Sequence, residues 1–129
     1  MKNLEKSKTI LVIDDSNTNI VLLEAILAEK GYFTRTAYNA EEARESITKY
    51  MPDLILLDLL MPKISGYDFL KELKNNPEVD SIPVIVVSAH LETGNIKRVM
   101  DLGATDLIMK PIDIAQLIKK VSKILNSHE

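Results

Sequence analysis

The sequence predicts a single α/β domain in which a doubly wound, five-stranded parallel sheet is flanked by five helices. Short apolar segments alternate along the chain with longer segments of helical periodicity, an order that is typical of this fold class. The apolar segments include unbroken runs such as 54–57, and strands buried on both faces of a parallel sheet have this composition. At 129 residues the chain is long enough to bury one core.

The strands are predicted from short runs of apolar or β-branched residues that end in polar residues. The run at 32–37 alternates only weakly, so we expect it near an edge of the sheet. The predicted strands are 9–13, 32–37, 54–57, 82–87 and 106–109. We expect residues 1–8 to form a flexible leader, 9–126 the folded domain and 127–129 a tail.

The helices are predicted from capping residues and from apolar residues spaced three or four apart. Ser16 or Asn17, Asn39 with Glu42, and Asp113 with Gln116 are the expected starts, while Gly31, Asn75-Asn76-Pro77 and Gly103 mark ends. The predicted core-facing positions are Ile20, Leu23 and Leu27; Ala40, Ala43, Ile47 and Tyr50; Phe69, Leu70 and Leu73; Ile96, Val99 and Met100; and Ile114, Leu117, Ile118, Val121, Ile124 and Leu125.

The composition excludes several classes of function. No cysteine is present, so disulfides, thiolate catalysis and cysteine metal sites are excluded, and two histidines are too few for a histidine-built zinc site. The net charge of −3 gives no electrostatic reason to expect nucleic acid or an anionic membrane as a direct partner. No apolar segment has the length of a membrane helix or a signal peptide, and we expect a cytoplasmic protein.

Polar residues follow the predicted strands at the ends where ligands bind in open α/β sheets. They are Asp14 and Asp15, Asp58, Ser88 and Lys110. Each has a structural explanation by itself, because the first two aspartates suit a helix cap, Asp58 and Ser88 suit turns, and Lys110 suits a solvated strand end. Their occurrence together at one edge of one sheet favours a functional site.

The residue types at this edge suit phosphoryl chemistry. Three neighbouring carboxylates repel one another unless a cation lies between them, and Mg²⁺ is favoured because it takes few carboxylates and keeps waters that a phosphoryl oxygen can replace. A lysine and a hydroxyl stabilise charge on phosphoryl oxygens, and a carboxylate can itself be the nucleophile. The glycine-rich loops that cradle nucleotide phosphates are absent from the sequence.

From Thr9 to about Leu125 the sequence resembles the receiver domain of two-component response regulators. The matching features are Asp14-Asp15, Asp58 with Met61-Pro62, Gly66, Ser88-Ala89, Gly103-Ala104 and Lys110-Pro111, each beside the expected element. The resemblance, and not the strand pattern, implies a flavodoxin-like sheet with strand order 2-1-3-4-5. It also implies that Asp58 accepts a phosphoryl group from a phosphohistidine on a sensor histidine kinase or a histidine phosphotransfer protein.

The resemblance further implies roles for the other residues at this edge. Asp15 and Asp58 would bind Mg²⁺, with Asp14 acting directly or through water and the backbone carbonyl of Leu60 completing the protein ligands. Ser88 would donate to a phosphoryl oxygen, and Lys110 would pair with the phosphoryl group. The peptide bond from Lys110 to Pro111 is expected to be cis. Movement of Ser88 and Lys110 would switch the fourth helix and last strand, the surface that partners contact.

The sequence departs from the receiver pattern at Leu107, where the family usually has the tyrosine or phenylalanine that moves with Ser88. An aromatic rotamer switch therefore cannot operate here. Leu60 and His90 stand where receivers tune the attack of water on the acyl phosphate. Because Leu60 is apolar and cannot orient water, we predict slow self-dephosphorylation. The alternative interpretation of His90 is a surface-loop histidine.

Two other functions are weighed against a phosphorylation switch. An interaction module that is not phosphorylated would be indicated by loss of Asp58, Asp15 or Lys110, and all three are present. A haloacid-dehalogenase-type phosphatase would need D-x-D, which Asp58-Leu59-Leu60 does not supply.

The sequence leaves two arrangements of the receiver open. It could be a stand-alone receiver with a protein target, or a piece of a larger regulator with a fused output domain. Asn19 and the long first helix resemble receivers of hybrid kinases. Homodimerisation through the last helix and strand also stays open.

Overall fold

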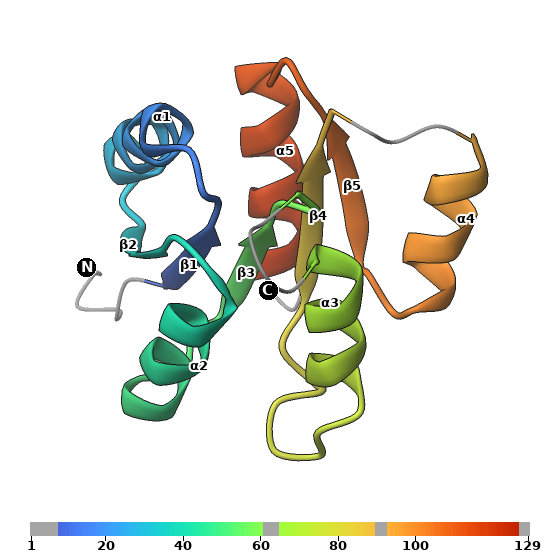
Figure 1. Cartoon of the computed structure of the whole chain (residues 1–129). Coiled ribbons are helices and arrows are strands. Elements are labelled where there is room, and N and C mark those ends of the chain that lie inside the picture. The colour runs from blue at the N-terminus through green and yellow to red at the C-terminus, as the bar shows by residue number, and fades with distance from the viewer. Residues whose placement is uncertain (1–7, 61–64, 90–92, 127–129) are drawn as a thin grey trace.

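The computed structural model describes residues 8–60, 65–89 and 93–126, and over these ranges the chain forms one parallel sheet between two layers of helices (Figure 1). The sheet has five strands in the order β2-β1-β3-β4-β5, and every neighbouring pair is parallel. The predicted fold class and the strand order implied by the family resemblance are both confirmed.

The elements alternate from β1 to α5 along the chain. The strands are β1 (Thr9–Ile13), β2 (Phe33–Ala37), β3 (Leu54–Leu57), β4 (Val84–Ser88) and β5 (Asp106–Met109). The helices are α1 (Asn17–Glu29), α2 (Ala40–Lys49), α3 (Gly66–Lys74), α4 (Thr93–Asp101) and α5 (Ile114–Leu125). Among the described residues, none of these helices combines the length and apolar character needed to cross a membrane.

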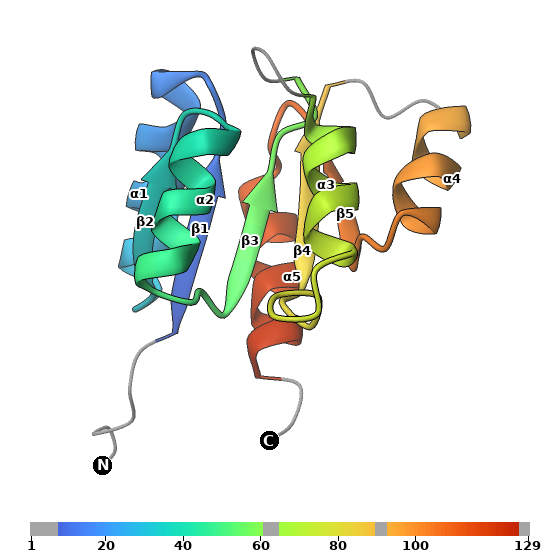
Figure 2. The same ribbon diagram turned by 60° about the horizontal axis from the view of Figure 1, so that its bottom comes forward.

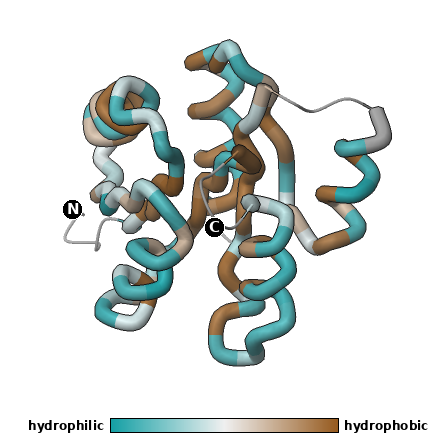
Figure 3. Tube along the Cα trace, in the orientation of Figure 1, coloured by the Kyte–Doolittle hydropathy of each residue, from teal (hydrophilic) through white to brown (hydrophobic). Residues whose placement is uncertain are grey.

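Two hydrophobic clusters pack on opposite faces of the sheet. One cluster joins the inward residues of α1 and α5 to the strands, and the other joins those of α2, α3 and α4. Figure 2 shows α2 and α3 in front of the sheet with α5 behind it. The hydrophobic colour in Figure 3 is concentrated along the central strands, because these strands are buried on both faces.

The strand boundaries follow the predictions except at β2, which begins at Phe33 instead of Tyr32, and at β4. Ile82 and Pro83 were predicted in this strand, but it begins at Val84. Proline has no N–H to give to a strand ladder, although the carbonyl of Pro83 still accepts a hydrogen bond from the Ile55 N–H. The weakly patterned β2 is an edge strand as expected, with Phe33 exposed at its start.

Side chains cap the helices largely where the sequence predicts. Ser16, rather than Asn17, caps α1 by accepting a hydrogen bond from the Asn19 N–H, and Asp113 caps α5. Asn39 caps α2 by accepting from the Glu42 N–H. The reciprocal contact of this box differs from the usual one, because Glu42 accepts from the N–H of the residue before the cap.

Most of the predicted core-facing positions are buried. Tyr50, Met100 and Ile114, each at or beside a helix terminus, are about half exposed. Ile96, Ile118 and Ile124 are partly buried and pack against the two clusters. Ile26, which was not predicted, is buried beside Leu27 on α1. Residues 1–7 of the predicted leader (1–8), Met61-Pro62, His90 and the tail (127–129) lie outside the described residues.

Candidate functional site

The candidate site lies where the strand order reverses between β1 and β3. Ile13 and Leu57 are register partners at the carboxyl ends of these adjacent strands. Asp14 and Asp58 come next in the chain, and the Asp58 N–H donates to the Ile13 carbonyl at 2.9 Å. The crevice outside such a reversal is the usual ligand site of an open α/β sheet.

Three carboxylates meet at this reversal. Single carboxylate oxygens of Asp14, Asp15 and Asp58 lie within 4.8 Å of one another. Asp14 and Asp58 are 2% and 5% exposed, whereas Asp15 is exposed at the rim. Burial, followed by the nearby Asp14 charge, raises the pKa of Asp58 to about 6 against the opposing effect of Lys110. The site therefore holds more negative charge than its own residues compensate.

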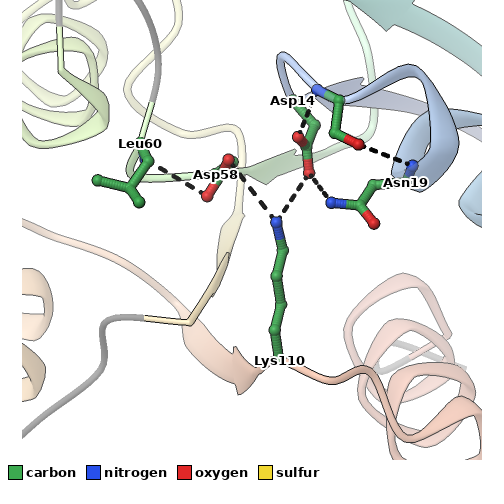
Figure 4. A network of polar contacts seen from close by, with 6 residues as sticks. Asp14, Asn19, Asp58, Leu60 and Lys110 are labelled. Atoms are coloured by element: carbon green, nitrogen blue, oxygen red, sulfur yellow. Dashed lines mark hydrogen bonds and ion pairs between the residues drawn. The ribbon is translucent and has the colours of Figure 1, made fainter.

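Lys110 approaches the carboxylates from the end of β5. Its Nζ lies 3.2 Å from Asp14 Oδ2 and 3.7 Å from Asp58 Oδ2, as Figure 4 shows. The peptide bond between Lys110 and Pro111 is cis, as the family resemblance predicts. The Lys110 N–H donates to the Ser88 carbonyl at 3.0 Å, which joins the ends of β4 and β5. The Lys110 ammonium group thus forms ion pairs with two of the three carboxylates.

Asp14 is held by more donors than the sequence predicts. The Ser16 N–H donates to Asp14 Oδ1 at 2.9 Å, and the Asn19 side-chain amide donates to Asp14 Oδ2 at 3.3 Å. The sequence indicates Asn19 only through its likeness to receivers of hybrid kinases. Its position at the first turn of α1, five residues after Asp14, was the signal that could have identified this contact.

The segment after Asp58 is fixed against the start of α3. The Leu60 N–H donates to Asp58 Oδ1 at 3.3 Å, and the Leu60 side chain is exposed. The Gly66 N–H donates to the Leu59 carbonyl at 2.8 Å. A Cβ at Gly66 would lie 2.5 Å from both the Asp58 carbonyl oxygen and Leu59 Cα, so only glycine fits there without a backbone shift.

The remaining predicted residues lie at β4 and β5. Ser88 is fully buried as the last residue of β4, and Ala89 follows it at an exposed position. Leu107 pairs with Val86 in the sheet and packs, partly buried, against the cluster under α4. The structure therefore brings Asp14, Asp15, Asp58 and Lys110 into one cluster, with Ser88 joined to it through the backbone of Lys110.

The donor set fits a small divalent cation. Carboxylate oxygens are the ligands that Mg²⁺ prefers, and the exposed Asp15 leaves one side of the cluster open to water. Burial, followed by the neighbouring Asp14 charge, raises the pKa of Asp58, so a bound cation would favour its charged form.

Comparison with known proteins identifies the family. The model of the response regulator receiver domain matches residues 10–122. This chain belongs to the response regulator receiver family. It is a signalling domain of two-component systems, a class whose members are generally not enzymes.

Similar receivers occur both alone and within longer proteins. The chain is 36% identical over 118 residues to the response regulator PleD of Caulobacter vibrioides, covering 92% of this chain and 26% of PleD. It is 32% identical over 118 residues to the polar-differentiation response regulator DivK of Brucella anthropi, and the match covers 92% of this chain and 96% of DivK. The solved receiver domain of a histidine kinase from Syntrophus aciditrophicus aligns with a TM-score of 0.86 at 35% identity, and the match covers 94% of this chain and 92% of that structure. The chain spans about a quarter of the length of the first curated relatives it matches.

Proposed function

We propose that this receiver accepts a phosphoryl group on Asp58 from a phosphohistidine of a sensor histidine kinase or histidine phosphotransfer protein. The observation that supports this most directly is the cluster of Asp14, Asp15 and Asp58 with Lys110 reaching into it. In the transfer, an oxygen of the Asp58 carboxylate forms a bond to phosphorus as the bond from phosphorus to the histidine nitrogen breaks. The imidazole leaves with the electron pair of that bond.

The proposal assigns a Mg²⁺ ion to the cluster. Asp15 and Asp58 would hold it, with Asp14 acting directly or through water and the Leu60 carbonyl as a further ligand. When bound, the ion neutralises charge on the phosphoryl oxygens. Lys110 leaves its contacts with the carboxylates to pair with the phosphoryl group, and Ser88 donates its hydroxyl to a phosphoryl oxygen.

Phosphorylation then changes the surface formed by the loop after Ser88, α4 and β5. Ser88 and Lys110 are joined by a backbone hydrogen bond, so movement of either end displaces the neighbouring strand end as well. Leu107 of β5 packs with its aliphatic side chain against the cluster that includes Val99 of α4. In our proposal it transmits the change by packing, without an aromatic rotamer switch, and it acts together with Ala89, His90 and the segment from Pro111.

The partners follow from this chemistry. The donor is a phosphohistidine protein, and the output is a downstream protein or a fused domain, either with or without dimerisation through α5 and β5. We place the receiver in the cytoplasm, with neither nucleic acid nor membrane as a direct partner. The apolar and exposed Leu60 cannot orient water, so the phosphorylated state is expected to last minutes or longer. A lifetime of seconds, measured by loss of the phosphoryl group over time, would contradict this expectation.

The test is intact mass after incubation with Mg²⁺ and acetyl phosphate. We expect the wild-type protein to gain one phosphoryl group and Asp58→Asn to gain none, with the adduct abolished by a chelator. A phosphohistidine donor is tried next if acetyl phosphate gives no adduct. Failure with both donors would contradict the proposal and favour a receiver that binds partners without being phosphorylated.

A further inference from the structure

We infer that Asn19 is a positioning residue that holds Asp14 in the orientation needed for cation binding. The inference rests on the proposed function, because it concerns the same cluster of carboxylates. Asn19 is the third residue of α1, after the cap at Ser16, and its side chain reaches back toward the strand end (Figure 4).

The contact divides the two oxygens of Asp14 between different donors. Oδ1 accepts from the Ser16 N–H at 2.9 Å. Oδ2 accepts from Asn19 Nδ2 at 3.3 Å and lies 3.2 Å from Lys110 Nζ. Asp14 is almost completely buried, so its orientation depends on these three donors rather than on water.

The two donors on Oδ2 differ in what they do to the charge of the site. Lys110 compensates the negative charge, but the proposed mechanism requires it to move to the phosphoryl group. The Asn19 amide has no net charge, so it holds the carboxylate while reducing the attraction of Asp14 for a cation far less than Lys110 does. Asn19 would thus keep Asp14 oriented when Lys110 is engaged elsewhere.

Asn19 is also fixed by the fold rather than free to rearrange. Its own backbone N–H donates to Ser16 Oγ at 3.3 Å, and the next residue of α1, Ile20, is buried in the core. The helix start therefore sets the distance between the amide and Asp14. Partners of metal-binding side chains that are held in this way typically change metal affinity about tenfold or more when they are removed.

The experiment compares Asn19→Ala with Asn17→Ala. Asn17 is a matched control because it lies in the same helical turn, and its side chain accepts a hydrogen bond from the Tyr38 hydroxyl, whereas that of Asn19 donates to Asp14. Mg²⁺ affinity is measured by NMR titration of the amide signals, and the phosphorylation rate with acetyl phosphate is measured across Mg²⁺ concentrations. Asn19→Ser, one bond shorter than asparagine, is a second variant in case the alanine variant unfolds.

We expect both Asn19 variants to raise the apparent Mg²⁺ dissociation constant about tenfold, while Asn17→Ala stays within about twofold of wild type. At saturating Mg²⁺ the phosphorylation rate of Asn19→Ala should return to within about twofold of wild type, because the carboxylates and Lys110 are intact. Circular dichroism in EDTA verifies that the proteins compared are folded.

Wild-type affinity in folded Asn19 variants would overturn the inference and leave the proposed function standing. A rate that stays low at saturating Mg²⁺ would also overturn it, since positioning for the cation would then not be the role of Asn19. A wild-type protein that neither binds Mg²⁺ nor is phosphorylated would overturn the proposed function itself, and the inference with it.

Discussion

Asp58 is buried beside a second carboxylate, and this placement makes its charge unfavourable in the metal-free protein. Burial and the Asp14 charge raise the pKa of Asp58 to about 6, whereas an aspartate in the unfolded chain titrates near its ordinary, lower pKa. Folding therefore favours proton uptake by Asp58 between these two values. For this group the free energy of unfolding falls as the pH rises toward 6.

Asp58→Asn should consequently stabilise the metal-free protein at neutral pH. The amide has the shape of the carboxyl group without its charge, and we expect a gain of about 1–2 kcal/mol at pH 7. The difference from wild type should shrink as the pH falls through 6 and vanish below about 4, where Asp58 is protonated in both states. Urea unfolding in EDTA at several pH values measures this. A difference independent of pH would contradict the assigned cause.

Gly66 is the second residue on which the geometry of the site depends. Gly66→Ala places a Cβ 2.5 Å from backbone atoms of Asp58 and Leu59, so we expect a loss of about 3 kcal/mol or more. Gly31→Ala is the control, because Gly31 has a φ of +92° but nothing within 4 Å of the added Cβ. It should cost about 1 kcal/mol from backbone strain alone. Equal losses in chemical denaturation would show that the contact at Gly66 is unimportant.

At the scale of elements, α4 is joined to α3 by a contact between side chains. The Arg98 guanidinium lies 3.9 Å from the centre of the Tyr67 ring, and Tyr67 directly follows Gly66. The backbone near Asp58 is thus connected to α4 through Gly66 and Tyr67 at the start of α3. Within α4, Val99 is buried and its neighbour Met100 is exposed.

Arg98→Ala should loosen α4 more than it destabilises the domain. Loss of an exposed cation–π contact costs about 0.5–1 kcal/mol, and we expect faster amide hydrogen exchange confined to α4 and the start of α3. Lys97→Ala removes only the ion pair from Lys97 to Asp101 within the same helix. Its exchange rates should stay near those of wild type. Equal exchange in the two variants would argue against coupling between the helices.

Sequence prediction succeeded where the signal was local. The run 54–57 and the caps Asn39 and Asp113 depend on neighbours in the chain, so the elements were placed to within a residue or two. The start of β4 was misplaced because the apolar run continues through Pro83, whose missing N–H becomes decisive only within a sheet. The cap at Ser65 was also missed.

The candidate site also has one part that the sequence predicts and another part that it does not. Asp14, Asp15, Asp58 and Lys110 were predicted because strand ends of one sheet meet at one edge, and the structure brings them together. The Asn19 contact and the tight packing at Gly66 depend on distances between elements that no local pattern specifies.

For the whole molecule, the proposed cation site couples metal binding to stability. A ligand that binds only the folded state stabilises it in proportion to the logarithm of its concentration. We expect Mg²⁺ to raise the free energy of unfolding by about 2.7 kcal/mol at a concentration 100 times its dissociation constant. Asp15→Asn should lose most of this gain, because Asp15 is one of the two aspartates that we propose to hold the ion. Thermal unfolding across Mg²⁺ concentrations tests this, and identical curves for the two proteins would contradict it.

The reversal of strand order at β1 and β3 has a consequence for protein synthesis. Asp14 and Lys110, which touch in the folded domain, are separated by 96 positions in the sequence. Lys110 is synthesised after β1, β3 and β4. The nascent chain therefore contains Asp14, Asp15 and Asp58 before it contains the lysine whose ammonium group lies close to two of them. A chain that ends before β5 therefore has all three carboxylates of the cluster without the lysine that compensates part of their charge.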